Sequence, residues 1–108
     1  MATKDERVLE VVVFGLNAGV TSDQLLATVD GVTAWAAERP GFVSRDLYAA
    51  GDRWVDVVRW RTLADAESAA VAAESSERCA PMFGLIDMGS VLMLHGQPVT
   101  APVAAGTR

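Results

Sequence analysis

Four short segments dense in apolar residues predict β-strands, because polar residues interrupt them at strand-like rather than helical spacing. The turn residues Gly, Pro, Asn and Asp separate them from their neighbours, as expected at strand ends. The expected strands are residues 8–16, 42–48, 53–60 and 90–95.

Helical periodicity fills the gaps between these strands. Apolar residues recur at helical spacing from Leu25 to Ala36, and small apolar residues recur from Ala66 to Ala73. Each stretch follows a threonine with a polar residue three positions later, which is a typical helix start. These starts are Thr21 with Gln24 and Thr62 with Asp65. A further helical turn or two, kinked at Pro81, is expected over 75–85.

The resulting order is β-α-β-β-α-β, and its two halves echo one another. Residues 7–14 read RVLEVVVF and residues 53–60 read RWVDVVRW, with Glu10 and Asp56 at matching positions. This order predicts an α+β ferredoxin-like sandwich with an antiparallel sheet in the order 4-1-3-2. Another α+β arrangement of the same elements is the alternative. We expect one domain over 1–95 and a flexible tail over 96–108.

Bulk composition narrows the functional class. The chain has 108 residues, a net charge of −5 and a single cysteine, Cys79. The acidic balance argues against nucleic-acid and anionic-membrane partners, and a lone cysteine fits a reducing compartment. The polar start MATKDERV is unlike a signal peptide, and no apolar run is long enough to span a membrane. A cytoplasmic protein is therefore expected.

The strands carry two sets of side chains, because successive residues of a strand point to opposite faces. We predict that the aliphatic set packs on the helices: Leu9, Val11, Val13, Val43, Leu47, Val55 and Val57. The other set is aromatic with embedded acids: Glu10, Val12, Phe14, Phe42, Ser44, Asp46, Tyr48, Trp54, Asp56, Val58 and Trp60. This composition is typical of a lined pocket, which a second copy of the sheet would close.

With these elements in place, the chain resembles the dimeric α/β-barrel superfamily, and most of all its antibiotic biosynthesis monooxygenase-like domains. The resemblance covers about residues 8–95. It is carried by Arg39-Pro40-Gly41-Phe42, by Trp60 followed closely by TLADAESAA, and by Ile86-Asp87.

The resemblance implies a homodimer, a cavity that binds an aromatic small molecule, and oxygenase chemistry without a cofactor. It also implies that Asn17, at the end of the first strand, lies in that cavity. The tryptophan and histidine of haem-degrading relatives are missing, since Ala69 and Cys79 stand near those positions. Haem degradation is therefore not expected.

The candidate catalytic residues are Asn17, Asp56 and His95, and the candidate substrate-binding residues are Phe14, Asp46, Tyr48, Trp54 and Trp60. For several of them a structural role is the competing interpretation. Trp60 would then anchor the second helix, Tyr48 and Trp54 would contact a second subunit, and His95 would be solvated. No metal site is predicted, because one histidine with scattered carboxylates lacks ligand spacing.

Asp46 and Asp56 pose the sharpest question. If the hairpin places them opposite one another in a dry cavity, their repulsion should raise one pKa and suit acid–base work. The favoured alternative is that Arg45, Arg53 or Arg59, or an arginine from a second subunit, neutralises them. A register change of one residue would separate them.

Two functions remain open from the sequence. One is a small cofactor-independent monooxygenase, or a related isomerase or cyclase, acting on an aromatic or polyketide-like molecule. The other is a ligand-binding or structural dimer without catalysis, since a fold alone does not determine activity.

Overall fold

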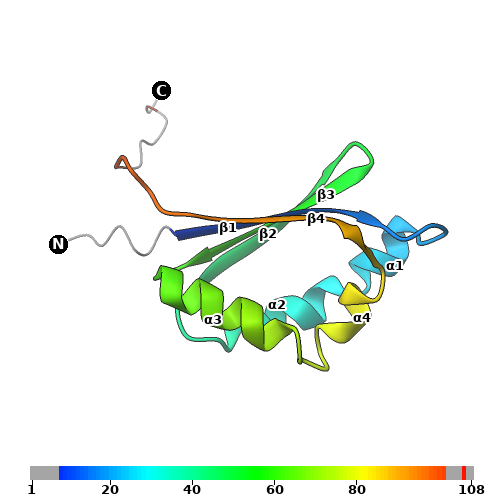
Figure 1. Ribbon diagram of the computed structural model, residues 1–108, viewed down its shortest axis with the longest axis horizontal. Helices are drawn as coiled ribbons and strands as arrows, with labels where there is room; N and C mark the ends of the chain where they lie inside the picture. The colour runs from blue at the N-terminus through cyan, green and yellow to red at the C-terminus, as the bar shows by residue number, and fades with distance from the viewer. Residues whose placement is uncertain (1–7, 102–105, 107–108) are drawn as a thin grey trace.

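The computed structural model describes residues 8–101 and residue 106, and these form one sheet with helices packed on one of its faces (Figure 1). The elements in chain order are β1 (Val8–Leu16), α1 (Ser22–Leu26), α2 (Val29–Ala37), β2 (Phe42–Ala50), β3 (Arg53–Trp60), α3 (Leu63–Ala73), α4 (Ala80–Phe83) and β4 (Ile86–Gly96). Within the described residues, no helix is long and apolar enough to cross a membrane.

The four strands lie in the order β2-β3-β1-β4, and every neighbouring pair is antiparallel. Read from the other edge, this is the predicted order 4-1-3-2. The ferredoxin-like α+β fold is therefore confirmed. The two strands that echo one another in sequence, β1 and β3, are the adjacent central strands, where Val11 pairs with Val57.

The predicted helix over Leu25 to Ala36 is instead two helices, α1 and α2. The chain turns at Thr28, whose backbone N–H and side-chain Oγ1 both donate to the Leu25 carbonyl, at 2.9 and 2.7 Å. A hydroxyl that bonds the preceding turn competes with the regular helical ladder, which accounts for the break.

Both predicted helix starts are present. Thr21 and Gln24 form a reciprocal capping box at the start of α1. Thr62 caps α3 by accepting from the Asp65 backbone N–H at 2.9 Å. These caps satisfy backbone donors that a helix start leaves without partners.

The prediction of which sheet face meets the helices is wrong for β1 and β3. Phe14 packs with Leu25 of α1, and Trp60 packs with Ala66 and Ala69 of α3, so the aromatic and acidic set lies beneath the helices. The alternating aliphatic set, which includes Val11, lies on the outer face, which is the face of the sheet that the helices do not cover. Between the sheet and the helices there is space for long side chains, and the embedded acids accept hydrogen bonds in that space.

In β2, a bulge between Phe42 and Ser44 interrupts the pairing with β3. From Ser44 to the two-residue turn at Gly51 and Asp52 the pairing is regular, and Leu47 pairs with Asp56 and shares its helix-facing side, as predicted for Leu47. Asp46 pairs with Val57 on the outer face instead.

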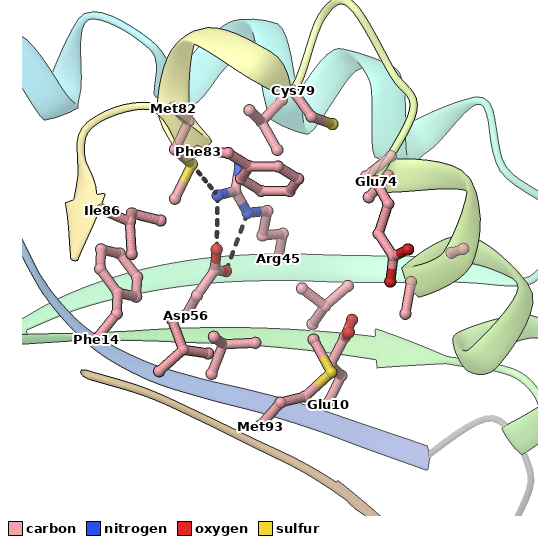
Figure 2. A pocket seen from close by; sticks show the side chains of 18 of the residues that line it. Glu10, Phe14, Arg45, Asp56, Glu74, Cys79, Met82, Phe83, Ile86 and Met93 are labelled. Atoms are coloured by element: carbon pink, nitrogen blue, oxygen red, sulfur yellow. Dashed lines mark hydrogen bonds and ion pairs between the residues drawn. The ribbon is translucent and has the colours of Figure 1, made fainter. Parts of the chain in front are cut away.

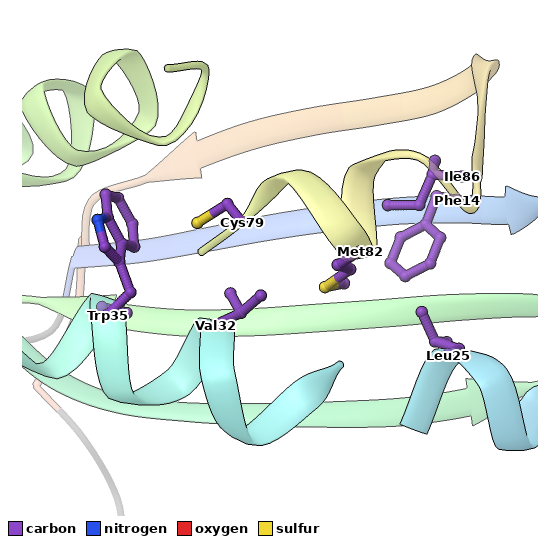
Figure 3. Packing of buried hydrophobic residues seen from close by; sticks show 8 residues of the cluster. Phe14, Leu25, Val32, Trp35, Cys79, Met82 and Ile86 are labelled. Carbon is purple, nitrogen blue, oxygen red and sulfur yellow. The ribbon is translucent and has the colours of Figure 1, made fainter. Parts of the chain in front are cut away.

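The core consists of two groups of buried side chains under the helices. Figure 3 shows the larger one, in which Leu25, Phe14, Met82 and Ile86 gather at one end and Trp35 lies at the other. The smaller one joins Val8, Val58 and Trp60 to the alanines of α3. The alanines keep α3 close to the sheet, while a cavity remains between the two groups.

Candidate functional site

The cavity lies between the helix-facing side of the sheet and α2, α3 and α4, and it has a volume of about 270 Å³. Most of its lining is aliphatic, aromatic or sulfur-containing, including Phe14, Trp35 and Met82. Its charged lining residues are Glu10, Arg45, Asp56 and Glu74. Figure 2 shows Glu10 on the sheet side and Glu74 on the side of α3. An apolar hollow with a few polar groups is the usual composition of a small-molecule site.

Asp56 is held by a buried arginine from the neighbouring strand. Arg45 donates from Nε to Oδ1 at 3.0 Å and from Nη2 to Oδ2 at 2.7 Å, while its side chain is only 3% exposed (Figure 2). Its remaining amino group donates to Thr33 Oγ1 and to the Val29 carbonyl, at 2.8 and 3.2 Å. The two-pronged contact uses both oxygens of Asp56, and it ties β2 and β3 to α2.

Glu10 is the second buried carboxylate, and its environment differs. Trp60 Nε1–H donates to its Oε1 at 3.1 Å, and Nε2 of His95 lies 3.4 Å from its Oε2. The Glu10 side chain is 9% exposed. The His95 Nε2 atom is buried and makes no hydrogen bond within the described residues. Glu10 therefore carries one neutral donor and a nearby imidazole, where Asp56 carries a guanidinium.

The two predicted acids do not form a pair. Asp46 lies on the outer face, half exposed, with Arg59 at 3.7 Å, whereas Asp56 lies inside with Arg45. The two-residue turn at Gly51 and Asp52 pairs Ala50 with Arg53, and the same register pairs Asp46 with Val57 rather than with Asp56. The prediction of a facing Asp46–Asp56 pair is wrong, and its alternative, neutralisation by arginines, is what the structure shows.

The other predicted site residues divide into two groups. Phe14 and Trp60 line the cavity, and Trp60 also packs on α3, as its structural interpretation requires. Trp54 packs at the edge of the larger core group, and Tyr48 is exposed on the outer face. Tyr48 therefore does not line this cavity, and its alternative role, contact with a second subunit, stays a prediction.

Asn17 lies outside the lining of the cavity. Its Nδ2 donates to the Gly84 carbonyl at 3.2 Å, and its backbone N–H donates to the Leu85 carbonyl. Both bonds join the turn after β1 to the chain between α4 and β4. The expectation from the resemblance, that this asparagine lies in the cavity, is not met.

The contributors to the cavity that sequence reasoning missed include Arg45, Trp35 and Met82. Arg45 enters the prediction only as a possible partner of the acids, although its spacing of two residues from Leu47 puts both side chains on the same face of the strand. Trp35 on α2 and Met82 on α4 supply helix-side walls. The apolar periodicity of the helices marks such residues as buried, but it does not separate a cavity wall from a filled core.

No group of three or more His, Cys, Asp or Glu residues in the described part of the chain is arranged to hold a metal ion.

Comparison with solved structures finds the same fold in proteins that include oxygenases. A variant of SnoaB, a cofactor-independent oxygenase from Streptomyces nogalater, superposes with a TM-score of 0.71 at 14% identity, over 89% of this chain and 96% of that one. A monooxygenase from the gene ActVA-Orf6 of Streptomyces coelicolor, in complex with nanaomycin D, gives a TM-score of 0.64 at 22% identity, over 94% and 95%. Rv0793 from Mycobacterium tuberculosis gives 0.66 at 20% identity, over 89% and 98%.

No family model matches the sequence, and no curated protein is similar to it in sequence. The fold is that of the antibiotic biosynthesis monooxygenase-like proteins, as the resemblance implied. Because the sequence identities are this low, the similarity supports a shared fold only, and the activity has to be argued from the cavity.

Proposed function

We propose that the chain is a small cofactor-independent monooxygenase-like enzyme that acts on an aromatic or polyketide-like molecule in the cavity beneath its helices. The observation that carries the proposal is an apolar cavity of about 270 Å³ whose wall includes Trp60 and two buried carboxylates. The likeness to oxygenases of the same fold supports the chemistry.

The proposed reaction converts an anthrone-type CH₂ group into a carbonyl. A basic group removes a proton, the resulting carbanion transfers an electron to O₂, and the two radicals combine into a peroxide anion, which takes a proton back to become the hydroperoxide. Loss of water then leaves the quinone, so that one O₂ supplies the carbonyl oxygen and one water molecule. The protein's part is to bind the substrate, take its proton and exclude bulk water.

The candidate bases differ in how their oxygens are engaged. Arg45 occupies both oxygens of Asp56, so this carboxylate is already engaged on the side of the arginine. Glu10 lines the cavity and accepts one hydrogen bond from a neutral indole, while His95 lies beside it outside the lining, so Glu10 is the better placed base. The second candidate function is a ligand-binding protein without catalysis. It is favoured by the same two hydrogen bonds from Arg45, because they leave Asp56 engaged in the fold.

The test is aerobic incubation with anthrone-type and quinol substrates, following the quinone absorbance. Ala73, which lines the cavity, is replaced by Phe to fill it, and Ala64, on the exposed side of α3, receives the same change as the control. We expect Ala73→Phe to lower the rate at least about tenfold and Ala64→Phe to leave it unchanged. A rate that neither substitution affects would place the reaction elsewhere.

A separate experiment tests whether Asn17 takes part in the reaction. If it reaches a developing oxyanion during turnover, Asn17→Ala should lower the rate by about a hundredfold. An unchanged rate assigns Asn17 to the turn alone, where its bond to the Gly84 carbonyl already places it.

We further propose that two copies of the chain associate through the outer faces of their sheets. Leu92 and Leu94 are more than half exposed there, beside Val11 and Val13 in the register of β1 with β4, and Asp46 and Arg59 lie toward the margin. An apolar centre with a polar margin is typical of a protein interface.

The association is measured by sedimentation velocity at micromolar concentration. We expect Leu92→Glu to give a monomer. Leu26→Glu, on the helix side and similarly exposed at 51%, should leave a dimer. A wild-type monomer would exclude this association.

A further inference from the structure

The charges around the cavity are unbalanced. Three carboxylates line it, those of Glu10, Asp56 and Glu74, against one cation, Arg45. Arg45 is committed to Asp56, Thr33 and the Val29 carbonyl, so it has little capacity left for a ligand. An anionic ligand would therefore meet uncompensated negative charge and no free cation.

Glu10 is the carboxylate with capacity to spare. Asp56 has both oxygens bound, and Glu74 is exposed directly after the end of α3. Glu10 is buried at the cavity wall and accepts a single hydrogen bond, from Trp60, at one of its oxygens. A carboxylate can accept bonds at about four lone-pair positions.

His95 lies on the neighbouring strand directly opposite Glu10, where the register pairs the two residues. Its Nε2 is 3.4 Å from Oε2 of Glu10 and is buried. Trp60 holds Oε1 of Glu10 by its hydrogen bond, and His95 lies beside Oε2, while the carboxylate lines the cavity. Trp60 is thus the residue that positions Glu10.

We infer that Glu10 is the specificity-determining residue of this cavity, and that it selects uncharged aromatic ligands bearing a hydroxyl donor over aromatic carboxylates. The inference rests on the proposed function for the place of binding and deepens it by naming the ligand class. A phenolic O–H donates to Oε2 of Glu10 while the ring lies against the apolar wall. A carboxylate at the same place meets like charge in a poorly solvated site.

The experiment measures binding by isothermal titration calorimetry at neutral pH, and it needs no turnover. The probes are 2-naphthol, its methyl ether 2-methoxynaphthalene, and 2-naphthoate, which share one ring system. We expect 2-naphthol to bind wild-type protein at least about tenfold more tightly than either of the others, since one lacks the donor and the other carries like charge. Equal affinity for the three, or binding of none of them, overturns the inference.

The variant Glu10→Gln tests whether Glu10 is the residue that causes the preference for 2-naphthol over 2-naphthoate. The amide oxygen can still accept from Trp60, so the wall is preserved while the charge is lost. We expect the preference for 2-naphthol over 2-naphthoate to fall to about threefold or less. Glu74→Gln at the cavity and Glu67→Gln on the exposed side of α3 should keep it. If Glu74→Gln removes the preference and Glu10→Gln does not, Glu10 is not the selecting group.

The two proposals fail separately. If anthrone is oxidised while 2-naphthoate binds as well as 2-naphthol, the ligand class is wrong and the oxygenase function stands. If the probes bind in the expected order and no substrate consumes oxygen, the cavity is a binding site without this chemistry. The wild-type series remains decisive even if Glu10→Gln does not fold.

Discussion

Separating Arg45 from Asp56 tests whether the buried ion pair stabilises the fold. Asp56→Leu would leave the guanidinium without two of its hydrogen bonds, those of 3.0 and 2.7 Å, in a position where the arginine side chain is only 3% exposed. Arg45→Met would leave a buried carboxylate and would also free Thr33 and the Val29 carbonyl.

Removing one partner of a buried pair typically costs about 3–5 kcal/mol, because the remaining charge stays buried without compensation. We expect Asp56→Leu near the lower value, since Arg45 keeps its bonds to α2, and Arg45→Met near the upper value. Against a typical total of about 5–15 kcal/mol, either loss is a large share of the stability. The corresponding fall in Tm is more than about 10 °C for a domain of this size.

The double variant separates charge from packing. With both groups replaced by apolar side chains, no buried charge remains, and stability should return to within about 2 kcal/mol of wild type. The assay is urea unfolding followed by tryptophan fluorescence, at matched protein concentrations because association would add to stability. The reasoning is refuted if either single variant loses less than about 1 kcal/mol, or if the double variant loses the sum of both.

Three further changes test local features of the fold. Gly41→Ala should lose about 2 kcal/mol in urea unfolding, because the φ of this residue is +81° and an added Cβ would lie 2.7 Å from the Cβ of Asp65. Thr62→Ala removes the cap of α3 and should cost about 1 kcal/mol in the same assay, while retention of full stability would show that the cap is dispensable. The hydrogen bond from Arg78 holds the pKa of the exposed Glu38 carboxyl below its ordinary value of 4.5, so its stabilising effect is present above that pH and is lost as the pH falls through the lower value. Glu38→Gln should therefore flatten the acid side of a Tm-versus-pH profile, and an unchanged profile would contradict the role of this pair.

Local patterns predicted the elements of this fold well. Strand segments, both threonine caps and the order of the strands follow from residues close to one another in sequence. The break at Thr28 is an exception, because apolar periodicity continues through it while a side-chain bond to Leu25 interrupts the helix. β4 begins at Ile86, four residues before the predicted start, since pairing with the end of β1 extends it past its apolar segment.

The orientation of the sheet did not follow from the pattern. Alternation separates the side chains of β1 into two sets, yet both sets are apolar enough to be buried. The set with Glu10 lies beneath the helices, where Trp60 donates to its carboxylate and Arg45 joins Asp56 to α2. Trp60 is 50 residues from Glu10 in sequence, and Arg45 is 11 residues from Asp56. The spacing of residues within one strand therefore does not predict these partners.

The sequence alone therefore determined which residues form strands and helices, which strands are central, and which two sets of side chains share a face. These properties depend on period, turns and caps, which act over a few residues. Only the tertiary structure decided which set meets the helices, and the register of β2 with β3 placed Asp46 and Asp56 on opposite faces. It also placed Glu10, Trp60 and His95 together beside a cavity. Such choices rest on packing and on partners for buried polar groups, and both are properties of the assembled sheet and helices.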